Sequence, residues 1–225
     1  MLLKTNLQSS RKQFEFKLLP KNKLERQNID GARYYVSPEG EKFKSVTSIL
    51  GEKMDKTYLY EWRKRVGEET ANKISTQAAV RGTQFHTICE KYLLGEDYIS
   101  KSMPTTLSMF KGIQSILDEK IGIIYGLEHF LYSTRLMAAG TADLICQYDS
   151  YNSIVDFKTS KRIKKEEDIE SYFLQATAYA LMVEERYGIY VPQIVIIMAI
   201  DHEEPKIFIK EKLHYLKRVN EIFCS

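Results

Sequence analysis

The stretch that decides the fold is Gly140-Thr141-Ala142-Asp143-Leu144, followed after a short polar segment by Ile154-Val155-Asp156-Phe157-Lys158-Thr159. Both runs are rich in strand formers, and the turn formers Asp149-Ser150-Tyr151-Asn152 lie between them, which predicts a β-hairpin. With a four-residue turn, Asp143 pairs opposite Lys158, and Asp156 lies two residues before Lys158. The pleat then directs these three side chains to one face of the sheet.

Two carboxylates and an ammonium on one face of an apolar hairpin are costly to leave unpaired, and a divalent cation would offset that cost. Mg²⁺ is typically held by one or two carboxylates together with phosphate oxygens, and it can activate water at a phosphodiester. A lysine beside it can position or deprotonate the attacking water, or stabilise the charge of the transition state. The alternative is an ordinary Asp-Lys cross-strand pair on a half-solvated sheet.

Length and composition indicate a soluble globular protein. The 225 residues suit one domain, or a domain with a small accessory lobe, and 44% are hydrophobic and 28% charged. A net charge of +3 does not by itself indicate a nucleic-acid binder, because clustering matters more than the total. One basic run follows the hairpin, Lys161-Arg162-Ile163-Lys164-Lys165. It can be an ordinary solvent-exposed face or, beside a metal site, an edge that contacts phosphates.

The cysteines and the start of the chain bear on its location. Cys89, Cys146 and Cys224 are widely scattered, which argues against a disulfide framework and favours a reducing, intracellular compartment. The start at Met1 to Asn6 lacks the apolar core of a secretory signal, and no stretch is long and apolar enough to span a bilayer. We therefore expect no membrane association and a cytoplasmic location, which is the host cytoplasm if the protein is phage-encoded.

Periodicity and turn residues predict the order of the elements. A hairpin of 32–36 and 42–45 is followed by helices over 53–66, 69–94 and 104–120, the second of them broken near Gly82. Strands over 127–133, 137–148 and 153–157 precede a helix over 166–187 that ends at Gly188, a buried strand over 193–200, a strand over 206–209 and a helix from 211. This order predicts an α/β (α+β mixed) fold with a central mixed β-sheet flanked by helices. We expect residues 1–45 to be an N-terminal extension with a β-hairpin, and residues 46–225 to form one compact domain with a helical N-terminal part.

Further side chains are expected to complete the site. His86 and Glu90 stand one helical turn apart, as do Gln175 and Tyr179 on the later helix. The first pair can approach one ion or form a surface pair, and an amide with a phenol can orient water, the lysine or a phosphate oxygen. Tyr179 could equally pack against the sheet. Glu128 could reach the same centre from the neighbouring strand or pair with a surface lysine, so Glu90 and Glu128 are assigned supporting roles.

Together these motifs resemble the PD-(D/E)xK nuclease superfamily in its RecB-like branch. The resemblance lies in Gly82-x-x-x-His86, Gly-x-x-Asp143, Asp156-x-Lys158 and Gln175-x-x-x-Tyr179, in that order, with Ser45-Val46-Thr47-Ser48-Ile49-Leu50 upstream similar to phage exonucleases. It covers about Ser45 to Tyr179. Ala142 stands where the name of the superfamily has proline, which is common in this branch.

The resemblance implies a restriction-endonuclease-like core (αβββαβ) and assigns roles to residues. His86, Asp143, Asp156 and the Phe157 carbonyl would ligate Mg²⁺ or Mn²⁺, Lys158 would be the catalytic lysine, and Gln175 and Tyr179 would support catalysis at the DNA strand. The four cysteines that hold an iron-sulfur cluster in some relatives are missing, so no such cluster is expected.

The sequence thus predicts a metal-dependent deoxyribonuclease, most simply an exonuclease acting on single-stranded DNA or strand ends in replication, recombination or repair. Alternatives are a structure-selective endonuclease of the same superfamily, a catalytically inactive DNA-binding module, or a metal-binding structural domain. Candidate strand contacts act by stacking and phosphate attraction, and each could instead be structural. They are Trp62, Arg63, Arg81, Thr159, Ser160, Lys161 and Arg162.

Overall fold

The computed structural model describes residues 11–224, so the expectation about Met1 to Asn6 lies outside the described residues. None of the helices within 11–224 combines the length and the apolar character needed to cross a bilayer. The strands are β1 (Glu25–Ile29), β2 (Ala32–Val36), β3 (Lys42–Ser45), β4 (Ile121–Ser133), β5 (Ala138–Tyr148), β6 (Tyr151–Ser160), β7 (Gln193–Ile200) and β8 (Lys206–Glu211). The helices are α1 (Val46–Lys53), α2 (Thr57–Val66), α3 (Glu68–Leu94), α4 (Pro104–Lys120), α5 (Glu170–Tyr187) and α6 (Leu216–Phe223), with short 3-10 turns at Glu166–Ile169 and Lys212–Tyr215.

The expected fold class is confirmed. Eight strands form one mixed sheet in the order β1-β2-β3-β5-β6-β7-β8, with β4 paired to β5. The β3–β5 and β6–β7 pairs are parallel and the other pairs are antiparallel. The run α4, β4, β5, β6, α5, β7 reproduces the expected αβββαβ order.

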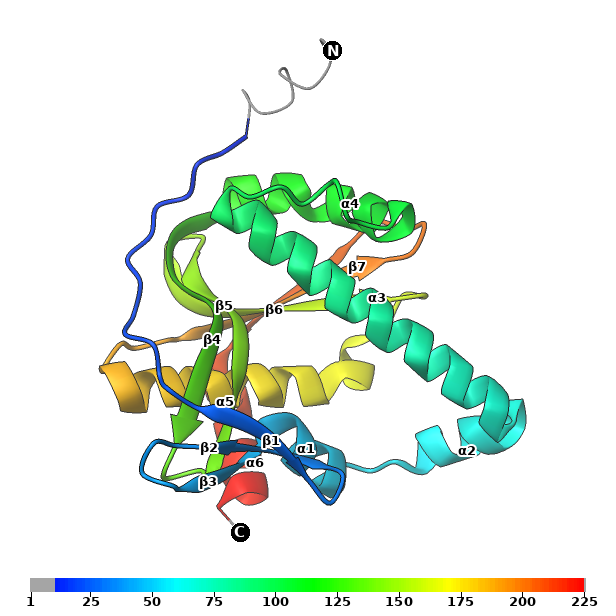
Figure 1. The fold of residues 1–225 in the computed structure, drawn as a ribbon, viewed down its shortest axis with the longest axis horizontal. Coiled ribbons are helices and arrows are strands. Elements are labelled where there is room, and N and C mark those ends of the chain that lie inside the picture. Colours follow the sequence, from blue (N-terminus) through cyan, green and yellow to red (C-terminus); the bar gives the residue numbers. More distant parts are fainter. Residues whose placement is uncertain (1–10, 225) are drawn as a thin grey trace.

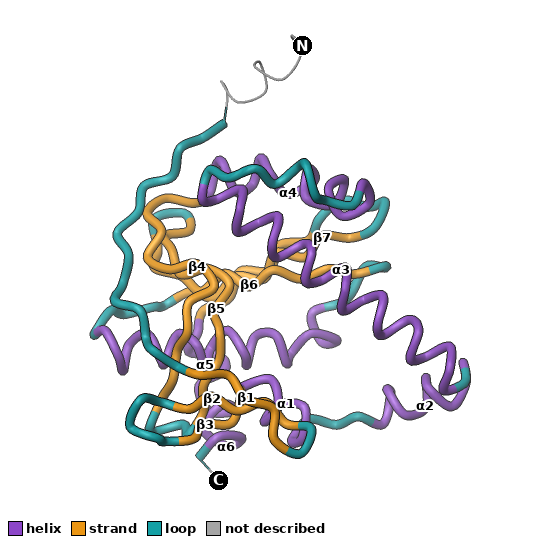
Figure 2. The backbone as a smooth tube through the Cα atoms, in the orientation of Figure 1, coloured by secondary structure: helices purple, strands orange, loops and turns teal. Residues whose placement is uncertain are grey.

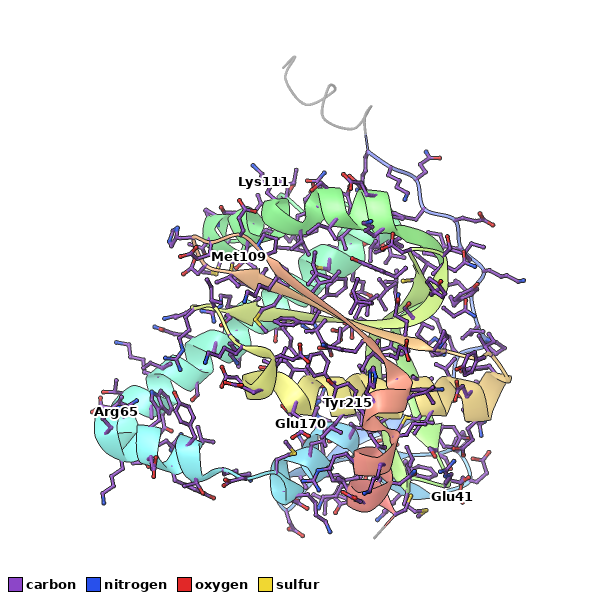
Figure 3. All side chains as sticks on the ribbon, turned by 180° about the vertical axis from the view of Figure 1, so that it is seen from behind. Glu41, Arg65, Met109, Lys111, Glu170 and Tyr215 are labelled. Carbon is purple, nitrogen blue, oxygen red and sulfur yellow. The ribbon has the colours of Figure 1, made fainter. Side chains whose placement is uncertain are left out.

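Helices cover the sheet on two faces (Figure 1). One core lies between the sheet and α3 and α4, and a second lies between the sheet and α5, α1 and α6. Seen from behind, Tyr215 lies beside α5 (Figure 3), where its ring stacks on Phe173 with centroids 5.1 Å apart. Along β6, Val155 and Phe157 join the first core and Ile154 joins the second. Because side chains alternate along a strand, Asp156 and Lys158 are directed to the α5 side.

The hairpin of β5 and β6 has a tighter turn than expected. Tyr148 pairs with Tyr151, so only Asp149 and Ser150 form the turn, and both have positive φ, 48° and 71°. That conformation matches the twist of antiparallel strands. The register places Leu144 opposite Val155, so the prediction that Asp143 pairs opposite Lys158 is wrong. The error of two residues leaves the parity of the pleat unchanged, which keeps the acidic side chains on the expected face.

Two helix predictions are corrected. α3 runs unbroken through Gly82, because one glycine costs a helix only about 1 kcal/mol and the core contacts of the residues that follow it, from Phe85 to Leu93, outweigh that. The helix expected over 53–66 begins later, at Thr57, as α2. A separate helix that was not expected, α1, precedes it and begins after Ser45, whose side chain caps the N–H of Ser48. α2 contacts α3 and extends away from the sheet with it, as the tube view shows (Figure 2).

The first strands join the same sheet. β2 and β3 form the expected hairpin, and β1 adds a further strand through the two-residue turn Asp30-Gly31, with φ of 51° and 79°. β3 then pairs with β5 at Ala138 and Ala139. The N-terminal strands therefore lie next to the strand that carries Asp143.

Candidate active site

The candidate site lies where β5 changes partners. Along one edge, β5 pairs with β6 through residues 144–148 and with β3 through residues 138–139, so residues 140–143 lie between the two ladders. The Asp143 carboxylate there accepts the backbone N–H of Phe157 at 2.8 Å. A side chain thus satisfies a strand N–H that the end of the ladder would leave unpaired.

Asp156 and Lys158 form a buried ion pair on β6. Asp156 is 1% exposed, its Oδ2 contacts Lys158 Nζ, and its Oδ1 accepts from Gln175 Nε2 at 3.1 Å. Lys158 Nζ also lies 4.9 Å from the centre of the Tyr172 ring, within the range of a cation–π contact. α5 therefore holds both members of the pair, through Gln175 and Tyr172.

His86 reaches the same centre from α3. Its Nε2 lies 2.7 Å from the carbonyl oxygen of Phe157, and because a carbonyl only accepts, this nitrogen donates. Its Nδ1 lies 3.4 Å from Asp143 Oδ1 and 3.9 Å from Glu128 Oε1. The Phe157 carbonyl therefore faces His86, and its expected role as a metal ligand stays a prediction.

Glu128 enters the site through an unusual backbone conformation. It lies on β4 between the pairs Leu127–Leu144 and His129–Ala142, which puts it across from Asp143. Its φ is 42°, in the left-handed region that residues with a Cβ rarely adopt. Such strain costs on the order of 1–3 kcal/mol and concentrates at functional sites. It directs a carboxylate toward His86.

The charges of the site shift one another's pKa values. Burial and the nearby Asp143 charge raise the pKa of Glu128 to about 7. Burial opposes the charged form of His86, but Asp143 outweighs it and raises the pKa of His86 to about 9. Burial raises the pKa of Asp156 to about 6 despite Lys158. Burial also disfavours the ammonium of Lys158, yet Asp156 holds its pKa above the ordinary value, so Lys158 carries a proton at neutral pH.

The donor set fits a hard divalent cation. His86, Glu128 and Asp143 each offer one ligand atom, and these atoms lie within 4.8 Å of one another. Two carboxylates and an imidazole suit Mg²⁺ or Mn²⁺ better than a soft metal. Asp156 stands beside this group, with both carboxylate oxygens directed to Lys158 and Gln175. Its expected ligand role stays a prediction.

Tyr179 packs directly against the backbone of β5. It is 3% exposed, and a Cβ added at Gly140 would lie 2.5 Å from its hydroxyl oxygen. Burial raises the pKa of Tyr179, so the phenol stays protonated. Tyr179 thus packs against the sheet and also lines a cavity over the site, and its expected role in orienting water, the lysine or a phosphate oxygen stays a prediction.

A cavity of about 640 Å³ opens over the site. Asp156 and Lys158 are not part of its lining, and residues of β1, β2 and α1 complete its wall. Of the residues expected from the sequence, the cavity is lined by Gly82, His86, Glu90, Glu128, Asp143, Gln175 and Tyr179.

The expected strand contacts lie outside this lining. Arg81 Nε donates to Thr159 Oγ1 at 3.4 Å, and the hydroxyl of Ser160 donates to the carbonyl of Arg162 at 2.6 Å. The Arg162 guanidinium donates to Tyr58 on α2 at 2.8 Å. Arg63 pairs with Glu68, Trp62 is half-buried and Lys161 is exposed. Their contacts with a strand stay predictions.

Two groups of residues were missed by the sequence reading. Tyr172 lies three residues before Gln175, a spacing that places both on one helix face and was available as a signal. Arg26 and Arg33 line the cavity from β1 and β2, and the turn former Asp30-Gly31 between them marks that hairpin.

The sequence of the chain is similar to that of two known proteins. Over 128 residues the chain is 29% identical to mitochondrial genome maintenance exonuclease 1 of Xenopus tropicalis, a match that covers 53% of this chain and 37% of the relative. The protein of the same name from Homo sapiens is 26% identical over 147 residues, covering 60% of this chain and 42% of the relative. Both are exonucleases by name. The chain thus spans about two fifths of the length of the curated relatives it matches.

Other comparisons add less. A solved structure of a protein from Eubacterium rectale assigned as an exonuclease aligns with a TM-score of 0.44 and 16% identity, over 64% of this chain and 63% of that one. No protein-family model matches the chain.

Proposed function

We propose that this chain is a divalent-metal-dependent nuclease of the PD-(D/E)xK superfamily, RecB-like branch, that hydrolyses DNA phosphodiester bonds. The observation that carries the proposal is the convergence of a histidine and two carboxylates, from α3, β4 and β5, at an open cavity, together with the buried Asp156–Lys158 pair on the neighbouring strand β6. The relatives named as exonucleases support the nuclease activity in this proposal. By that likeness, the enzyme acts as an exonuclease on single strands or strand ends.

The side chains have separate tasks in this proposal. Lys158 is held as an ammonium by Asp156, so it suits stabilising the negative charge that develops on the phosphate oxygens rather than removing a proton from water. Gln175 fixes Asp156 from the α5 side. His86 donates one ring N–H to the Phe157 carbonyl, which orients the other ring nitrogen toward Asp143 and Glu128.

His86, Glu128 and Asp143 would hold Mg²⁺ or Mn²⁺, with Asp156 as the further ligand that the resemblance implies. When bound, such an ion would supply a Lewis acid and would activate water at the phosphodiester. Burial and, after it, the charge of Asp143 raise the pKa of Glu128, and a bound cation would offset both effects.

The test uses Asp143→Asn, because its amide oxygen can still accept the N–H of Phe157 while the charge is lost. We expect release of nucleotides from labelled single-stranded DNA in Mg²⁺ or Mn²⁺, and a loss of about 10²-fold or more in Asp143→Asn and in Lys158→Met. Lys217→Met on α6, outside the cavity, is the matched control for the lysine.

A second readout is independent of activity. Mn²⁺ should raise the thermal midpoint of the wild type through preferential binding to the folded state, and it should raise that of Asp143→Asn much less. Undiminished digestion by both site variants would refute the assigned site. Cleavage of circular single-stranded DNA would favour the endonuclease alternative, because an exonuclease requires an end.

A further inference from the structure

The cavity over the candidate site has a second, basic wall. Arg26 and Arg33 line it from β1 and β2, opposite in charge to the Glu128 and Asp143 side. The hydroxyl-bearing side chains of Ser45 and Thr47 line the cavity beside them, where α1 begins. The two arginines present donors to a space whose other wall presents carboxylates.

The register of the hairpin places the two arginines side by side. Arg26 pairs with Tyr35, and Asn28 pairs with Arg33, so all four side chains share one face. Arg33 is the diagonal neighbour of Arg26 on that face. Tyr35 is 2% exposed and its hydroxyl lies 3.4 Å from Thr141 Oγ1 on β5. This contact fixes the arginine-bearing face next to the segment that ends in Asp143.

Within the part of the chain that the structure describes, neither guanidinium has a carboxylate partner. Within residues 11–224, no hydrogen bond or ion pair involves the side chain of Arg26 or Arg33, whereas Arg63 and Arg218 each pair with a glutamate. Guanidinium groups match phosphate oxygens in geometry as well as in charge. A ligand with several phosphates could therefore contact the acidic wall through a metal and the basic wall directly.

We propose that Arg26 and Arg33 bind a backbone phosphate of the nucleic-acid strand next to the phosphodiester being cleaved. The inference rests on the proposed nuclease function and assigns its substrate a second point of attachment. The β1–β2 hairpin is then part of the substrate site, and the strand passes between it and α3. A substrate with several phosphodiesters is favoured over one with a single phosphate.

The test measures binding of a labelled single-stranded oligonucleotide without terminal phosphates, in Ca²⁺ and over a range of salt. Each phosphate contact to a single strand contributes about 0.7 to the slope of log K against log salt. Arg26→Ala with Arg33→Ala should lower that slope by about 0.7, because the two arginines share one phosphate, and should weaken binding most at low salt. Lys217→Ala with Arg218→Ala on α6 removes the same charge outside the cavity and should leave the slope unchanged.

Arg26→Lys with Arg33→Lys keeps the charge and should restore most of the slope while binding stays weaker, because lysine lacks the bidentate geometry. Equal slopes for the cavity and the α6 double variants would overturn the inference while wild-type cleavage still supports a nuclease. A loss confined to oligonucleotides with a phosphorylated end would overturn the assignment to a backbone phosphate. A wild type that neither binds nor cleaves DNA would instead refute the proposed function.

Discussion

Gly140→Ala tests how closely α5 packs on the strand that carries Asp143. A Cβ at position 140 would lie 2.5 Å from the Tyr179 hydroxyl oxygen, 2.7 Å from Cε1 and 2.9 Å from Cζ. Tyr179 is 3% exposed, so its ring cannot swing into solvent and either the strand or α5 must shift. Overpacking of this kind costs about 1–3 kcal/mol of unfolding free energy.

A double-mutant cycle isolates that contact. Tyr179→Leu removes the ring, so Gly140→Ala should cost less than about 0.5 kcal/mol in that background, and the coupling free energy should be about 0.5–3 kcal/mol. Gly51→Ala is the matched control, because an added Cβ at Gly51 in α1 meets nothing within 4 Å. The control should raise stability by about 0.5–1 kcal/mol through the helix preference of alanine.

The assay is urea unfolding at neutral pH in EDTA, so that metal binding does not contribute. Unfolding free energies are compared at a common m value, the slope of the unfolding free energy against urea concentration. The m value scales with the surface exposed on unfolding and should be the same in all variants. A Gly140→Ala protein as stable as the wild type would refute the reasoning. The same conclusion would follow if its cost persisted in the Tyr179→Leu background.

Two further predictions concern Tyr92 and Tyr172. The Tyr92 hydroxyl donates to Asp118 at 2.6 Å, and burial together with this bond raises its pKa to about 12, so the folded state keeps a proton that the unfolded state loses near pH 10. Stability should therefore fall between about pH 10 and 12, and denaturant unfolding should show a smaller fall in Tyr92→Phe. Tyr172 contacts Lys158 with its ring and accepts from Lys164 through its hydroxyl at 3.2 Å. Tyr172→Leu removes the ring and should lower kcat about tenfold by loosening Lys158. Tyr172→Phe removes only the hydroxyl and should raise KM while kcat stays unchanged. Equal effects of the two variants on kcat and KM would argue against separate roles for the ring and the hydroxyl.

The sequence by itself determined the elements and the chemistry that local patterns encode. The alternation around Asp156 and Lys158, the continuous apolar run of β7 and the helix stop at Gly188 each depend on neighbours a few residues away. From these the mixed sheet between helices could be predicted, as could the candidate residues His86, Asp143 and Asp156. Where local rules competed the prediction erred, as at Gly82, where tertiary packing outweighs the preference of one glycine.

Only the tertiary structure decided how these residues meet. His86 and Phe157 are 71 positions apart, and no local spacing encodes their 2.7 Å contact. The same holds for the open segment of β5 between its two ladders and for the left-handed conformation of Glu128. It holds equally for the first hairpin, whose arginines line the cavity. Such features follow from which strands lie side by side, and that choice is made by burial summed over the whole chain rather than by any one segment.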